Sequence, residues 1–132
     1  MCLGGCIWTD RDRSRRYVDP YETVLYEMWF DDADIYCQYE TQHQRSTWTL
    51  VAIPDTSYGF DEIESVWVEI VGSYLYTYVI HFELTPYPDG YWRYVFDNQG
   101  SPEGSYHCGN AYEFEFTAYD YNGYYTTTWV EW

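Results

Sequence analysis

The residue types that most often carry chemistry are few in this chain and do not converge along the sequence. The histidines are His43, His81 and His107. A zinc-type site needs several His and Cys ligands at short spacing, such as Cys-x-x-Cys pairs, and the sequence has no such pair. It has no Gly-x-Ser-x-Gly elbow either, and His107 and Cys108 would point to opposite faces of a strand. We therefore predict exposed or edge histidines, no catalytic residue, no cofactor and no enzymatic activity.

Acidic side chains are the second source of chemistry, with 22 Asp and Glu in 132 residues. So many carboxylates form some close pairs in any fold, so paired acids for glycoside hydrolysis are uninformative and a hydrolase is only our third hypothesis. The cluster of Asp31, Asp32 and Asp34 suggests calcium, because hard cations bind clustered carboxylates in loops. It lacks the spaced acidic pattern of a calcium hand, so we predict an ordinary acidic turn over residues 31–34 and no metal.

The four cysteines, Cys2, Cys6, Cys37 and Cys108, form an even set in a small chain, which favours disulfides and an oxidising compartment. Three pairings are open. The stretch Leu3-Gly4-Gly5-Cys6 resembles the lipobox that bacteria cleave before lipid attachment, although no basic and apolar signal regions precede it. Cys6, or alternatively Cys2, is therefore a candidate lipid-attachment residue. We predict a secreted protein, extracellular, periplasmic or on the cell surface, whose only membrane contact is such an anchor.

The formal net charge of −16 is distributed unevenly. The chain has no Lys, and four of its six Arg lie in one short tract, Arg11, Arg13, Arg15 and Arg16. Phosphate neutralisation requires Lys and Arg, so the acidic body disfavours nucleic acids and anionic membranes. It favours basic or cationic partners.

Aromatic residues make up 23% of the chain, including 18 Tyr and 7 Trp. A domain of this size cannot bury them all, so several are expected at the surface. Exposed Tyr and Trp provide rigid, amphipathic contact area in protein interfaces and also stack on sugar rings. We predict an aromatic contact surface around the last hairpin, formed by Tyr119, Tyr121, Tyr124, Tyr125, Trp129 and Trp132.

The hydrophobic pattern predicts strands throughout, because apolar and polar residues alternate and no helical period is evident. Residues 1–20 are expected to be an Arg-rich leader or tether, and residues 21–132 a single domain. Pro88-Asp89-Gly90 and Asn122-Gly123 are turn signals. About eight short strands favour an antiparallel β-sandwich of the all-β class. The expected runs are 22–30, 35–39, 47–53, 66–70, 74–84, 92–96, 112–118 and 126–132.

The stretch from Ala111 to Gly123, which reads AYEFEFTAYDYNG, resembles the penultimate strand and final hairpin of bacterial immunoglobulin-like surface domains. The Thr-rich run 126–130 and the run 63–70 are similar to further strands of that family, so the resemblance covers about residues 50–132. It implies an immunoglobulin-like sandwich in which Cys37 pairs with Cys108, and Cys2 with Cys6. Tyr106-His107-Cys108 also resembles the Tyr-x-Cys of antibody-type domains, but that register leaves no place for the two strands after Cys108.

Together these features predict a non-enzymatic extracellular module that makes protein contacts, as an adhesive, scaffold or self-assembling surface protein. A carbohydrate-binding module that stacks Tyr and Trp on a glycan is the alternative. Protein partners or self-association are expected, and a glycan is the second ligand class.

Overall fold

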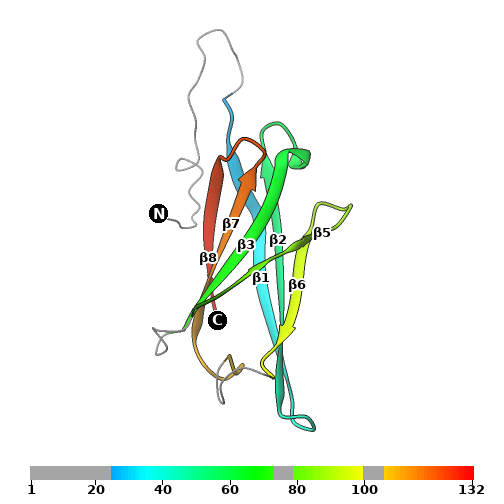
Figure 1. Ribbon diagram of the computed structural model, residues 1–132, viewed down its shortest axis with the longest axis vertical. Coiled ribbons are helices and arrows are strands. Elements are labelled where there is room, and N and C mark those ends of the chain that lie inside the picture. Colours follow the sequence, from blue (N-terminus) through cyan, green and yellow to red (C-terminus); the bar gives the residue numbers. More distant parts are fainter. Residues whose placement is uncertain (1–24, 73–78, 100–105) are drawn as a thin grey trace.

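The computed structural model describes residues 25–72, 79–99 and 106–132, and in this part the chain forms two antiparallel four-stranded sheets packed face to face (Figure 1). One sheet has the strand order β1-β2-β6-β5 and the other the order β4-β3-β7-β8. The predicted all-β sandwich of eight strands is confirmed. The strands are β1 (Met28–Glu40), β2 (Arg45–Thr56), β3 (Ile63–Gly72), β4 (Val79–Glu83), β5 (Thr85–Pro86), β6 (Trp92–Asp97), β7 (Tyr112–Asp120) and β8 (Tyr125–Glu131), and a short 3-10 turn, η2 (Phe60–Glu62), precedes β3.

The core lies between the two sheets and follows the alternation of the sequence. Inward-facing residues alternate with outward-facing ones along most of β2, β3 and β7, so one face of each strand packs in the core. Burial of each large apolar side chain stabilises the fold by about 1.5–3 kcal/mol. The fully buried members from these three strands are Trp48, Leu50, Ala52, Val66, Val68, Ile70, Phe114, Phe116 and Ala118.

The first strand differs from the prediction. Residues 22–30 and 35–39 were expected as two strands with an acidic turn over 31–34, but β1 runs without interruption through that acidic stretch. The pairing with β2 shifts between Phe30 and Asp32, which indicates a β-bulge. The bulge absorbs one residue, so Met28 before it and Ile35 after it can both be buried. The acidic turn was therefore wrong, because a bulge satisfies the apolar pattern on both sides without reversing the chain.

Two glycine turns are confirmed. Gly123 (φ +88°) lies in the β7–β8 hairpin and Gly90 (φ +90°) between β5 and β6, and both use a backbone conformation that disfavours other residues. The predicted strand over 74–84 is described only from residue 79, and it ends earlier than expected. Leu84 separates β4 from β5, so the chain crosses from one sheet to the other there.

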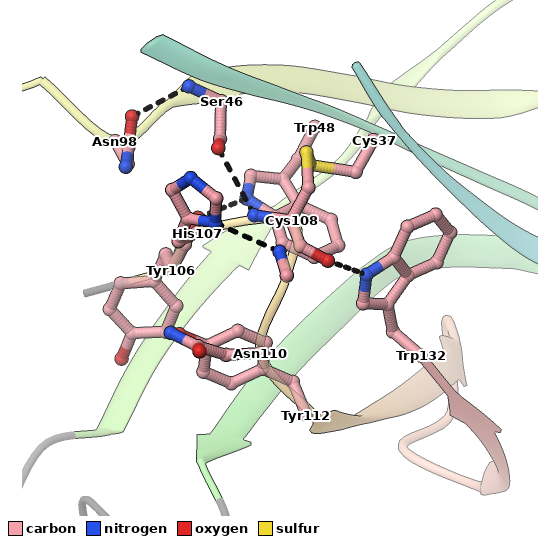
Figure 2. The surroundings of a disulfide bond; sticks show 11 residues. Cys37, Ser46, Trp48, Asn98, Tyr106, His107, Cys108, Asn110, Tyr112 and Trp132 are labelled. Carbon is pink, nitrogen blue, oxygen red and sulfur yellow. Dashed lines mark hydrogen bonds between the residues drawn. A yellow bond between two sulfur atoms is a disulfide. The ribbon is translucent and has the colours of Figure 1, made fainter. Parts of the chain in front are cut away.

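A disulfide joins Cys37 of β1 to Cys108, which lies just before β7, so the implied pair is confirmed. Hydrogen bonds converge on the same segment (Figure 2). The buried Trp48 indole N–H donates to the Tyr106 carbonyl (2.7 Å), and the Trp132 indole N–H donates to the Cys108 carbonyl (2.6 Å). The hydroxyl of Ser46 accepts the Cys108 N–H (3.0 Å). This corner ties the two sheets together at one end.

The other predictions about the cysteines concern residues outside the described ones. Cys2 and Cys6, with the proposed lipid attachment and the leader over 1–20, belong to that part of the chain. Among the described residues, no helix is long and apolar enough to cross a membrane.

Candidate functional site

The outer face of the β4-β3-β7-β8 sheet carries a shallow groove with a volume of about 430 Å³, which we call the sheet groove. All four strands of this sheet contribute side chains to it. Its lining combines aromatic rings, hydroxyl groups, carboxylates and a histidine. The lining residues are Trp67, Val68, Glu69, His81, Glu115, Thr117, Tyr119, Tyr125 and Thr127.

The strand register explains why these residues meet. Glu69 of β3 pairs with His81 of β4 on one side and with Glu115 of β7 on the other. Glu115 in turn pairs with Trp129 of β8. Directly paired residues on one sheet face have Cβ atoms about 4.5–5.5 Å apart. The sequence positions 69, 81, 115 and 129 thus form one continuous row across the sheet.

The next row along the strands runs from Glu83 of β4 to Thr127 of β8. Trp67 of β3 pairs with Thr117 of β7, and Thr117 pairs with Thr127 of β8. The hydroxyl groups of Thr117 and Thr127 are 3.4 Å apart and share a hydrogen bond. Beyond them, Tyr119 pairs with Tyr125 at the hairpin end of the groove. The groove therefore has two carboxylates at its Glu115 end and two tyrosine rings at its Tyr119 end.

The two carboxyl groups of the first row interact with each other. Partial burial raises the pKa of Glu115, and the negative charge of Glu69 and a side-chain hydrogen bond with Glu69 raise it further. Two like charges on directly opposite residues destabilise a sheet unless something else neutralises them. A cation bound in the groove would provide that neutralisation.

The aromatic rings are exposed but not coplanar. Trp67 and Tyr119 are each 36% exposed, and Tyr125 is 51% exposed. The rings of Tyr119 and Tyr125 lie 5.8 Å apart at an interplanar angle of 44°, and the Trp67 ring meets His81 at 64°. Faces of Trp and Tyr rings attract guanidinium and ammonium groups within about 6 Å. The groove therefore offers both a π surface and carboxylates to a cationic side chain.

The protein already uses this combination elsewhere. The guanidinium of Arg93 lies over the ring of Tyr87 (4.6 Å) and over that of Tyr91 (4.8 Å), and it pairs with Asp89 at 3.5 Å. Arg45 pairs with Glu40 and approaches Asp97. Both arginines in the described part of the chain are therefore engaged by its own acids.

The six predicted contact aromatics are all at least 36% exposed, but they do not form one surface. Tyr119 and Tyr125 line the groove, and Trp129 extends its carboxylate row. Tyr121 lies between β7 and β8 and is 70% exposed. Tyr124 contacts the ring of Tyr26 (5.9 Å) at the same end of the sheet. Trp132 instead packs against Trp48 beside the disulfide, with ring centroids 5.3 Å apart.

Seven of the nine groove residues were not predicted as site residues, and four of these seven are Trp67, Glu69, His81 and Glu115. The strand alternation placed each of them on an outward face, but only the register of three strands shows that they meet. The calcium candidates do not form a site. Asp31 accepts the Trp29 indole N–H (2.9 Å) and Asp34 accepts the Ile35 N–H (2.8 Å), while Asp32 is exposed beside them. Among the described residues, no three potential ligands are grouped to hold a metal ion.

No family model, curated protein or solved structure gives a significant match to this chain. The likeness to bacterial immunoglobulin-like surface domains thus stays a prediction from the sequence.

Proposed function

We propose that this domain is a non-enzymatic extracellular interaction module that binds an Arg- or Lys-bearing protein segment in the sheet groove. The observation that carries the proposal is the row of Glu69 and Glu115 beside the exposed rings of Trp67, Tyr119 and Tyr125. A carboxylate that binds a cation over an aromatic face combines a charge-assisted hydrogen bond with a cation–π contact. The net charge of −16 adds long-range attraction for a basic partner.

The extracellular assignment is supported by the Cys37–Cys108 disulfide, since such bonds persist in oxidising compartments. An adhesive or scaffolding role on a cell surface fits a sandwich that presents one open, aromatic-rich sheet face. The lipid anchor at Cys6 or Cys2 remains part of the hypothesis.

A glycan is the second candidate, because Trp67, Tyr125 and Trp129 are exposed on one sheet face beside the hydroxyl groups of Thr117 and Thr127. The 44° tilt between Tyr119 and Tyr125 is less suited to a flat sugar chain than a coplanar row would be. A glycan array separates the two candidates, since reproducible glycan hits that W67A abolishes would favour the second.

The test is calorimetric titration of the full chain at low ionic strength with a blocked peptide in which Arg alternates with Gly. The same peptide with citrulline in place of Arg keeps the shape and removes the charge. We expect the Arg peptide to bind and the citrulline peptide not to bind. Loss of two charge-assisted contacts in E69Q/E115Q should weaken binding at least about tenfold.

The matched control is E113Q/E131Q, which removes two carboxylates from the outer face of the same sheet but outside the groove. Glu113 and Glu131 are direct cross-strand neighbours, as Glu69 and Glu115 are. Binding by this control should stay within about twofold of the wild type, since screened charges at a distance contribute little. Equal losses in both double variants, or equal binding of the two peptides, would refute the groove as the site.

A further inference from the structure

The chain itself carries cationic side chains of the kind that the groove would bind. Its six arginines comprise Arg45 and Arg93, which are already paired with acids, and a tract of four over residues 11–16. That tract also contains Asp12, so its net charge is +3 from four Arg and one Asp. The tract lies in residues 1–24, outside the described part of the chain.

We infer that the arginine tract, Arg11, Arg13, Arg15 and Arg16, occupies the sheet groove of its own chain and competes there with an external basic partner. This inference rests on the proposed function, because it names an intramolecular ligand for the same groove.

The acidic outer face of the sheet is complementary in charge to the basic tract. Besides Glu69 and Glu115, the outer face of the sheet presents Glu83, Glu113 and Glu131 on its strands, all of them exposed. The only basic group among the groove's lining residues is the imidazole of His81. The most basic stretch of the chain thus matches an acidic, aromatic depression on the same domain.

Chain length is the second argument, because it permits the contact within one molecule. The described chain starts at Leu25, whose carbonyl accepts a hydrogen bond from the Ser57 hydroxyl (3.1 Å). Tyr26 then donates to the carboxylate of Asp120, the residue directly after groove residue Tyr119. The nine residues from Arg16 to Leu25 can span about 30 Å. The groove extends only four residues along β7 from Tyr119 to Glu115, about 13 Å.

The spacing within the tract is the third argument. Arg11, Arg13 and Arg15 occupy every second position, so in an extended segment their side chains project to the same side. Such a segment could set one guanidinium against the carboxylates of Glu69 and Glu115 and another against the rings of Tyr119 and Tyr125. Arg93 makes a contact of this type with two tyrosines and an aspartate elsewhere in the fold.

The experiment compares the full chain with R11Q/R13Q/R15Q/R16Q as receptors for the blocked Arg–Gly peptide. A tethered segment has an effective concentration in the millimolar range, so the wild type should bind the peptide about tenfold more weakly than the variant. A charge-balanced variant additionally carries D10N, D12N, D19N and E22Q, which restores the net charge of −16. Its affinity for the peptide should exceed that of the wild type by the same factor, because the increase comes from an empty groove and not from a more negative net charge.

A structural readout accompanies the affinities. The indole N–H resonance of Trp67 should shift between the wild type and the Arg-to-Gln variant, whereas that of Trp48, which donates to a buried carbonyl, should not. In the E69Q/E115Q background, replacing the tract should change neither the affinity nor the Trp67 resonance. Both effects should be independent of protein concentration.

The outcomes separate the two proposals. If all receptors bind the peptide equally through Glu69 and Glu115, the proposed function stands and the tract inference is overturned. If the wild type forms concentration-dependent oligomers that R11Q/R13Q/R15Q/R16Q abolishes, the tract binds a second copy and the intramolecular inference is overturned. If no receptor binds the peptide but the tract still shifts Trp67, the intramolecular contact is supported while an external partner of this chemistry is excluded.

Discussion

Glu69 of β3 and Glu115 of β7 face each other directly across the sheet, and the pKa of Glu115 is raised by its partial burial and by the negative charge of Glu69. Opposed like charges cost stability in a sheet, so this pair works against the fold that carries it. Replacing either residue with a neutral one would remove the cost. A cation bound between the two carboxylates would offset the same cost.

E115Q should therefore stabilise the fold near pH 7 by about 0.5 kcal/mol, since opposed like charges cost a few tenths to about 1 kcal/mol. The pKa of Glu115 is raised, first by burial and then by Glu69, with His81, Tyr119 and Tyr125 lining the same groove. A raised acid pKa means that the wild type loses stability as pH rises from the ordinary glutamate value through the raised one. The difference in stability between E115Q and the wild type should therefore decrease as pH falls.

Urea unfolding of both proteins across this pH range measures the difference, with E83Q as control because Glu83 pairs with Trp67 and not with an acid. The same E115Q protein should bind the Arg peptide more weakly. A variant that is more stable and yet binds less cannot owe its loss of binding to misfolding. An E115Q protein less stable than the wild type at neutral pH would contradict the argument.

Removal of the Cys37–Cys108 disulfide should cost about 4 kcal/mol, because the bond closes a loop with a sequence separation of 71. The loop is long, so its closure removes much entropy from the unfolded chain. In the C2S/C6S background this bridge is the only one that can form within the chain. We expect reduction of that protein to lower its urea midpoint strongly, and C37A/C108A to reproduce the reduced value. An unchanged midpoint would show that the hydrogen bonds around Cys108 hold the corner without it.

The sequence predicts most of the sandwich because its signals are local. The strand over 112–118 alternates Tyr112, Phe114 and Phe116 with acids and a threonine, and the structure buries those three aromatics in β7. The hairpin turn at Asn122-Gly123 has its physical cause in the positive φ of Gly123. Both signals lie within a few residues, so neither depends on the rest of the chain.

The groove could not be predicted because it depends on pairing between distant segments. Glu69 and Glu115 are 46 positions apart, and a shift of one residue in register would move either carboxylate to the core face. The contacts of Trp132 could not be predicted either, because they also involve distant segments. It follows the last strand and reads as a contact residue, but the corner that it covers is built by Trp48 and Cys108.

Asp120 stabilises the β7–β8 hairpin next to groove residue Tyr119. Its side chain is buried (3% exposed), and one carboxylate oxygen accepts the backbone N–H groups of Asn122 (2.8 Å) and Tyr124 (2.9 Å). The other oxygen accepts the Tyr26 hydroxyl. D120A should cost about 3 kcal/mol, because it removes the acceptor of the Asn122 and Tyr124 N–H groups and of the Tyr26 hydroxyl.

D120N is the matched variant, because its amide oxygen can still accept both backbone N–H groups. It should cost only about 1 kcal/mol, as should Y26F, since each weakens a single hydrogen bond. The double variant Y26F/D120N should lose about as much stability as either single variant, because both changes affect the same hydrogen bond. Urea unfolding of the four proteins measures these values. If D120A and D120N lose equal stability, the hairpin does not depend on the backbone N–H acceptors, and Tyr119 must be positioned by the strand pairing of β7 alone.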